Sequence, residues 1–216
     1  MGDIIYQVAV WLVPLVFAIV FHEIAHGWTA LAFGDTTGRD QHRLSLNPIR
    51  HVDPVGTIIL PMILAVTGAP IFGWAKPVPV RFEKLRNPRV QMIFVALAGP
   101  ATNFLLAIIA ALVLALHLTE SEFVQQMLVN FMAVNLFLGL FNLIPLPPFD
   151  GGHVVEGLLP RRAAAHYRKL GRWGLPILFL LLLVVPMVFN VNIVANLIGP
   201  PAMALMRILL GAPPGF

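Results

Sequence analysis

The stretch His22-Glu23-Ile24-Ala25-His26 lies inside a long apolar run that extends from Ile4 to about Phe33. Residues four apart share one face of an α-helix, so the two imidazoles can bind one metal ion. Glu23 lies one position further round the helix, where its carboxylate can reach a water molecule on that ion. Ionisable side chains are costly in a lipid-embedded helix, which argues against two interfacial histidines that merely pack near a helix end. The stretch therefore predicts a spanning helix that carries part of a metal site.

The composition indicates that the whole chain is embedded in a membrane. Of 216 residues, 58% are hydrophobic and 11% are charged, and the mean hydropathy is +0.85. Such a chain cannot cover a water-soluble surface. We therefore expect an all-α polytopic membrane protein, with a single membrane-embedded domain over residues 1–216.

Apolar runs of about 20 residues can cross the hydrocarbon core of a bilayer. The expected spans are about 4–33, 90–116, 124–144, 174–189 and 191–210, of which the last two are short. The apolar segment 55–75 is interrupted by prolines and glycines, so it either spans or dips in and returns. We thus expect about five to six transmembrane helices, with a re-entrant or extended (β-hairpin) segment between the first and second core helices.

The charged residues predict the orientation in the membrane. Basic residues form three clusters: Arg39, Arg43 and Arg50; Lys76, Arg81, Lys84, Arg86 and Arg89; and Arg161, Arg162, Arg168, Lys169 and Arg172. The turn near Thr119 carries only the acidic Glu120 and Glu122. Under the positive-inside rule the basic clusters face the cytoplasm and the N-terminus lies outside. This arrangement requires that segment 55–75 re-enters without crossing.

A catalytic zinc site usually has three protein ligands and keeps a fourth position open for water. Cysteine is absent from the chain, so imidazole and carboxylate groups are the available ligands. Asp150 follows the prolines that end the apolar run 124–144, at the membrane depth expected for His22 and His26. It is the candidate for the third ligand, and its alternative role is to cap the helix that follows it.

Three motifs make the chain similar to the site-2 protease family of intramembrane zinc metalloproteases, and specifically to its small members without a PDZ domain. They are His22-Glu-Ile-Ala-His26, Ala98-Gly-Pro-Ala-Thr-Asn103, and Asn142-Leu-Ile-Pro145 running on to Asp150-Gly-Gly-His153. The resemblance implies one Zn²⁺ per chain, bound by His22, His26 and Asp150, with Glu23 as general base. It implies a zinc metalloendopeptidase of the H-E-x-x-H type that cleaves membrane-anchored proteins within or near their transmembrane segments, in regulated intramembrane proteolysis.

We expect a catalytic core at about 4–160 and C-terminal hydrophobic helices at about 174–210. One departure is the stretch Asn47–Pro79, which is longer than in the most compact relatives. Within it, Trp74–Val80 is extended because Pro77 and Pro79 forbid a helix. This run could pair with an unwound substrate strand, or it could be an ordinary proline-stiffened loop.

Other polar residues have two interpretations each. Asn103 and Asn142 could donate an amide N–H to the oxyanion or position the substrate, or they could form helix-to-helix hydrogen bonds. His153 could support Asp150 as a partner outside the ligand set. His51 could form a polar lid or an auxiliary ligand near the metal, or it could be an exposed or capping loop residue.

Two other functions fit a metal-binding membrane protein. One is a transporter in which the histidines and Asp150 form a transit site, and the other is a catalytically silent membrane scaffold. The convergence of polar groups on one spot, with a base beside them, argues against both. The expected partners are the lipid bilayer and transmembrane segments of substrates, without nucleic acid, and the sequence leaves the oligomeric state open. We expect an integral protein of a prokaryotic plasma membrane, with its active site towards the cytoplasm.

Overall fold

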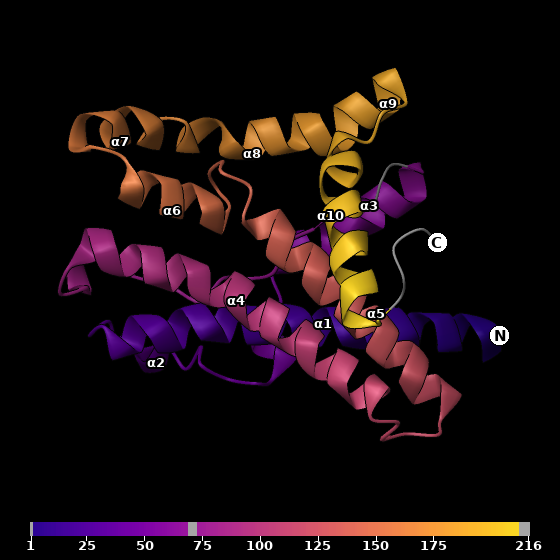
Figure 1. The fold of residues 1–216 in the computed structure, drawn as a ribbon. Helices are drawn as coiled ribbons and strands as arrows, with labels where there is room; N and C mark the ends of the chain where they lie inside the picture. The colour runs from indigo at the N-terminus through magenta and orange to yellow at the C-terminus, as the bar shows by residue number, and fades with distance from the viewer. Residues whose placement is uncertain (1, 69–72, 212–216) are drawn as a thin grey trace.

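A computed structural model describes residues 2–68 and 73–211, and every regular element in these two parts is helical (Figure 1). By length and composition, 4 helical stretches of the described residues can cross a membrane. They are α1 (Gly2–Ala32), α4 (Pro88–Ala115), α5 (Glu122–Asn142) and the run of α8 (Gly171–Phe179), η4 (Leu180–Val184) and α9 (Val185–Phe189). The expectation of an all-α membrane protein is confirmed.

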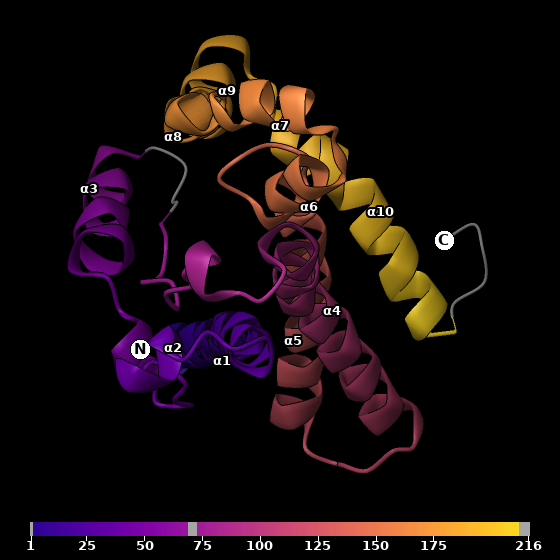
Figure 2. The same cartoon turned by 90° about the vertical axis from the view of Figure 1, so that its left-hand side faces the viewer.

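The remaining elements are short. They are α2 (Thr37–Asp40), η1 (Pro48–His51), η2 (Pro54–Ile59), α3 (Leu60–Thr67), η3 (Phe82–Lys84), α6 (Asp150–Leu158), α7 (Arg161–Arg168) and α10 (Ile193–Leu209). In Figure 2 α1 is seen nearly end-on, whereas α10 lies across the view, so α10 does not run alongside α1. It is a shorter apolar helix of 17 residues, below the about 20 that typically cross a bilayer.

The core is formed by α1, α4 and α5, which pack against one another, while α6 packs on α4 and α10 on α5. Ala107, Ala110 and Ala111 of α4 are buried against Met132 and Leu136 of α5. Small residues at a helix interface let the two backbones approach closely, which is how helices associate in lipid. This packing fixes where the ends of α4 and α5 lie relative to α1.

A proline in α1 creates a further link between α1 and α5. Pro14 has no N–H, so the carbonyl of Val10 lacks its helical donor. The side-chain amide of Asn130 on α5 donates to this carbonyl at 2.8 Å. An unpaired carbonyl at membrane depth would be costly, so Asn130 has a structural role.

The segment between α1 and α4 folds back on itself. It enters η2 and α3, residues 69–72 lie outside the described part, and residues 73–81 return as extended chain. The Trp74 N–H donates to the Gly56 carbonyl at 3.2 Å, and the Thr57 hydroxyl donates to the Trp74 carbonyl at 2.9 Å. The extended alternative of the sequence prediction therefore fits residues 73–81, whereas a β-hairpin does not, because residues 2–68 and 73–211 contain no strand.

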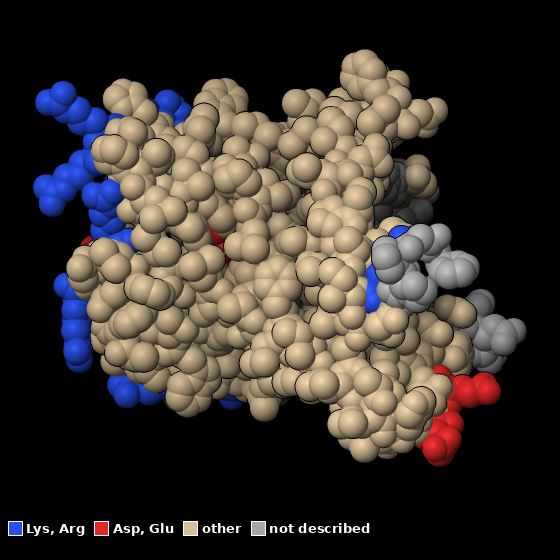
Figure 3. Space-filling view, viewed as in Figure 1, with Lys and Arg blue, Asp and Glu red and all other residues tan. Residues whose placement is uncertain are grey.

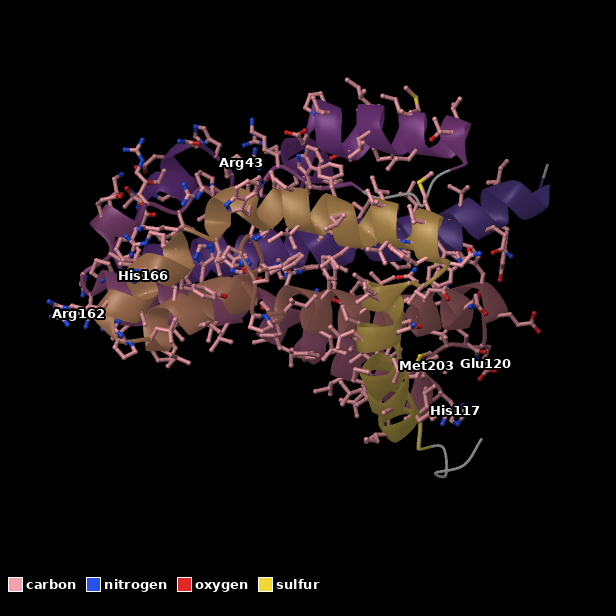
Figure 4. The ribbon with its side chains drawn as sticks, turned by 90° about the horizontal axis from the view of Figure 1, so that it is seen from above. Arg43, His117, Glu120, Arg162, His166 and Met203 are labelled. Carbon is pink, nitrogen blue, oxygen red and sulfur yellow. The ribbon has the colours of Figure 1, made fainter. Side chains whose placement is uncertain are left out.

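Charge is separated along the molecule. In Figure 3 most Lys and Arg atoms gather at one end, Asp and Glu atoms project at the other, and the face between them is mainly uncharged. Figure 4 labels Arg162 and His166 at the first end and His117 and Glu120 at the second. A mainly uncharged face between two charged ends is what a protein surrounded by lipid requires.

Candidate metal centre

Three side chains from two distant parts of the chain meet between α1, α4 and α6. His22 and His26 lie on one face of α1, and Asp150 is the first residue of α6. Their ligand atoms all lie within 4.8 Å of one another. His22 Nε2 and His26 Nε2 are 3.0 Å apart, and Asp150 Oδ2 is 3.2 Å from the first and 3.3 Å from the second. Zinc bonds of about 2.0–2.1 Å in a tetrahedron place neighbouring ligand atoms roughly 3.3 Å apart, so the spacing fits zinc.

The outer nitrogens of the two imidazoles have other partners. His22 Nδ1 lies 2.5 Å from Asn103 Oδ1, and His26 Nδ1 lies 2.7 Å from the Val95 carbonyl oxygen. Both partners are oxygen atoms that accept, so each Nδ1 donates, and in the neutral imidazole this tautomer leaves the Nε2 lone pair for a metal. Asp150 Oδ2 is buried and receives no hydrogen bond from any described residue. Three potential ligand atoms that face one another at this spacing form a site suited to a cation.

Glycines let the backbone come close enough to build this centre. A Cβ on Gly99 would lie 2.5 Å from His26 Nε2 and 2.6 Å from His22 Cε1, so α4 can approach α1 only without a side chain there. A Cβ on Gly151 would lie 2.3 Å from the carbonyl oxygen of Leu143. The absence of side chains at these two positions brings Asp150 to the histidines.

Glu23 is hydrogen-bonded to residues 73–81, which we call the extended segment. Its Oε2 accepts a hydrogen bond of 2.8 Å from the backbone N–H of Val78. Arg43 holds the same segment from the other side, since its Nη2 donates to the carbonyl oxygens of Lys76 at 2.6 Å and Pro77 at 3.3 Å. The extended segment therefore fixes the position of Glu23 beside the metal ligands.

A cavity of about 890 Å³ joins these groups. His22, Glu23, His26 and Asp150 line it, together with Val78 of the extended segment. Charged residues also line it: Glu83, Arg89, Glu156, Arg161 and Arg168. The cavity is large enough for a short stretch of extended peptide beside the three ligand atoms.

The remaining predicted residues lie in different environments. Asn142 and His153 line the cavity, whereas Asn103 is wholly buried behind His22. His51 is buried at the end of η1, where its Nε2 lies 2.8 Å from the Ser45 carbonyl oxygen and its own carbonyl accepts from the Lys76 N–H at 2.9 Å. It is not an exposed loop residue, and it is not among the residues that line the cavity.

Sequence reasoning missed two buried polar residues near the site, Asn135 and Arg43. Asn135 is wholly buried on α5 and contacts Asn103. Arg43 is 7% exposed, and its place in a basic cluster of the sequence gives no sign of this burial. The signal for Asn135 was available, because an amide inside an apolar spanning helix needs a partner.

Asp35, just after α1, anchors the far end of the extended segment. Its carboxylate accepts from the Arg81 N–H at 2.6 Å, and from the hydroxyl and N–H of Thr37 at 2.5 and 2.9 Å. Burial alone raises the pKa of Asp35, but these hydrogen bonds, together with the charge of Lys84, outweigh burial and hold the pKa below its usual value. Asp35 is therefore ionised near neutral pH and fixes the chain at Arg81.

Comparison with known proteins gives a consistent picture. The chain matches the family model of peptidase family M50 over residues 10–125 and 117–185. It is 39% identical over 183 residues to "Putative zinc metalloprotease YwhC" of Bacillus subtilis, which is 81% of this chain and 80% of that protein. It is 31% identical over 190 residues to "Putative zinc metalloprotease Rip2" of Mycolicibacterium smegmatis, which is 84% of this chain and 68% of that protein. No solved structure matches the chain.

Proposed function

The chain belongs to peptidase family M50, the site-2 proteases, and we propose from this membership how its own residues perform the reaction. The protein is an integral membrane protein and an intramembrane zinc protease. The resemblance carried by the three sequence motifs is confirmed, and zinc as the cofactor is supported by the names of the relatives. These matches do not favour a transporter or a silent scaffold.

His22, His26 and Asp150 would hold one zinc ion per chain. The observation that carries this proposal is the set of three potential ligand atoms separated by 3.0, 3.2 and 3.3 Å. Three protein ligands are the number that catalytic zinc sites use, with one position left for water. This makes the enzyme a metalloendopeptidase of the H-E-x-x-H type.

Glu23 would act as the general base. When bound, zinc polarises the scissile carbonyl and lowers the pKa of a water ligand to about 7. The Val78 N–H occupies Oε2 of Glu23, which leaves Oε1 to take the proton from the attacking water. Glu23 then delivers this proton to the leaving amine, so hydrolysis needs no covalent intermediate with the protein.

The substrate would be a transmembrane segment that has locally unwound, because a peptide bond inside a helix is shielded. The extended segment lines the cavity with Pro77, Val78 and Val80 and could contact the unwound chain. Asn142 also lines the cavity, and its Nδ2 donates to the Leu138 carbonyl at 3.0 Å. We assign substrate or oxyanion positioning to Asn142, and a supporting role beside the mouth of the cavity to His153.

The orientation follows from charge and from the folded-back segment. The hydrogen bond between the Trp74 N–H and the Gly56 carbonyl brings the two ends of residues 56–74 together, which supports re-entry without crossing. The basic end of the molecule would then face the cytoplasm, and the N-terminus and Glu120 would lie outside. A prokaryotic plasma membrane fits the organisms of the relatives. We place the catalytic core at residues 4–160 of one membrane-embedded domain.

Reconstitution tests the proposed function directly. The purified chain is placed in lipid vesicles, its zinc content is measured, and cleavage of a membrane-tethered reporter is followed. We expect one zinc per chain, loss of cleavage when a chelator removes the metal, and recovery when zinc is added. If the protein is prepared with excess zinc, yet binds no zinc and leaves the reporter intact, the assignment is overturned.

A further inference from the structure

A chain of buried amides runs from α5 through α4 to the metal centre. Asn103 on α4 and Asn135 on α5 are both 0% exposed. Asn135 Nδ2 donates to the Phe131 carbonyl at 2.8 Å, and Asn135 Oδ1 accepts from Asn103 Nδ2 at 2.7 Å. Asn103 Oδ1 in turn lies 2.5 Å from His22 Nδ1. The chain of hydrogen bonds thus links a backbone carbonyl of α5 to a metal-ligating imidazole on α1.

Each link in this chain has a fixed direction. The Phe131 carbonyl can only accept, so Asn135 must turn its NH₂ group towards it and its oxygen towards Asn103. That oxygen accepts, so Asn103 must turn its NH₂ group towards Asn135 and its own oxygen towards His22. An imidazole nitrogen that faces this oxygen must donate. Nδ1 of His22 therefore carries a proton, and in the neutral imidazole this tautomer leaves the Nε2 lone pair for a metal.

Asn103 could not fix this direction as firmly by itself. Its NH₂ group has a second acceptor, the Ala18 carbonyl, but at 3.3 Å, and that carbonyl also lies within reach of the helical N–H of residue 22. Without Asn135, either orientation of the Asn103 amide leaves a polar group poorly paired. In the flipped orientation the NH₂ group faces His22 Nδ1, and the proton of the imidazole must move to Nε2.

From this geometry we infer that Asn135 is a positioning residue, which orients Asn103 so that His22 presents an unprotonated Nε2 to the metal. The inference rests on the proposed function, because it takes His22 as a zinc ligand. Asn135 has no hydrogen bond to any of the three metal-ligating residues, and it acts on His22 through Asn103. It also links the arrangement of α5, the helix that leads to Asp150, to the protonation of the ligand on α1.

Asn130 provides a matched control on the same helix. It is 3% exposed and donates to the Val10 carbonyl at 2.8 Å, so its replacement also removes a buried bond between α5 and α1. It has no hydrogen bond to Asn103 or His22 among the described residues. Asn130→Leu therefore measures the purely structural cost of losing such an amide.

The experiment measures the zinc Kd of the full chain in lipid vesicles, by competition with a chelator. We expect Asn135→Leu to raise the Kd roughly tenfold, at the lower end of the 10–100-fold typical for partners outside the ligand set, and Asn130→Leu to leave it within about threefold. Nitrogen-15 spectra of histidine-labelled, metal-free protein should show His22 protonated on Nδ1 in the wild type and a larger Nε2–H population in Asn135→Leu.

A second substitution separates orientation from packing. In Asn103→Asp both side-chain oxygens accept, so the group presents an acceptor to His22 in either orientation and no longer needs Asn135. The double variant Asn103→Asp, Asn135→Leu should therefore recover the Kd of Asn103→Asp alone. An equal Kd for Asn135→Leu and Asn130→Leu, or a double variant that remains about tenfold weaker than Asn103→Asp, would overturn the inference. If Asn135→Leu does not fold, the double variant should still fold according to the inference. A double variant that also fails to fold would count against the inference. A wild-type chain without zinc would instead refute the proposed function itself.

Discussion

The backbone N–H of Val78 donates a hydrogen bond of 2.8 Å to Oε2 of Glu23, across 55 positions of the sequence. The contact joins α1 to the extended segment that precedes α4. It gives the carboxylate beside the metal ligands a fixed position without an ion pair. Arg43 holds the carbonyls of Lys76 and Pro77 in the same segment, so the base and the segment that flanks the cavity are positioned together.

Replacement of the base should separate metal binding from catalysis. We expect Glu23→Gln to retain zinc and to lower cleavage by about 10²–10⁴-fold, the range that a general base contributes. Zinc content and cleavage of a membrane-tethered reporter are measured on the same vesicles. Glu122→Gln, which removes one carboxylate at the opposite end of the molecule, should behave like the wild type. Cleavage by Glu23→Gln at the wild-type rate would exclude Glu23 as the base.

Removal of a metal-ligating side chain should abolish tight zinc binding and, with it, cleavage. We expect Asp150→Ala and His22→Ala each to raise the zinc Kd by more than the roughly 100-fold that loss of an outer partner can cause, because two protein ligands remain. The measurement is zinc retained after equilibration with a chelator. Asp40→Asn, at an exposed carboxylate of α2, is the control. If Asp150→Ala still binds zinc as tightly as the wild type, Asp150 is only a helix cap.

The close approach of α4 to α1 should not tolerate even a methyl group. A Cβ at Gly99 would lie 2.5 Å from His26 Nε2, so Gly99→Ala should displace the histidines and lower zinc affinity by at least about tenfold while the helices persist. Gly199→Ala is the matched control, because a Cβ there meets nothing within 4 Å and alanine favours a helix by roughly 0.5–1 kcal/mol. Circular dichroism and zinc binding distinguish the two variants. Unchanged zinc binding in Gly99→Ala would show that the helices can move apart without loss of the site.

The absence of native cysteine allows a direct test of topology. A cysteine introduced in Arg81→Cys should react with a membrane-impermeant reagent only from the cytoplasmic side, and one introduced in Glu120→Cys only from outside. Both side chains are exposed. Labelling of the cysteine at position 81 from outside would instead mean that segment 55–75 crosses the membrane.

Asp35 should make stability depend on pH. Its pKa is lowered in the folded protein, so its contribution is present above the unfolded pKa, near 3.8, and is lost as the pH falls through the lower folded value. We expect Asp35→Asn to lower the free energy of unfolding by about 1.5–3 kcal/mol at neutral pH, since hydrogen bonds to a charged group are worth that much, and by less in acid. Unfolding in mixed micelles at several pH values measures the difference. A destabilisation that does not change with pH would show that the charge of Asp35 is not responsible.

The sequence by itself determined the features that depend on local periodicity and composition. A spacing of four residues places His22 and His26 on one helical face in any fold, and long apolar runs without charge can be accommodated only in lipid. For this reason α1, α4 and α5 lie close to their predicted ranges. The motifs also identified the family, and charge alone suggested which end faces the cytoplasm.

Only the tertiary structure decided what these local features meet. Asp150 comes within 3.2 Å of His22 because the packing of α4 and α5, and the missing side chain at Gly99, carry it there. The contact of Val78 with Glu23 and the direction of the amides at Asn103 and Asn135 likewise join residues that are distant in sequence. Hydrogen bonds of this kind depend on distances of a few tenths of an ångström between packed helices. Periodicity predicts the face on which a residue lies, but it does not specify which atom of another helix that residue will contact.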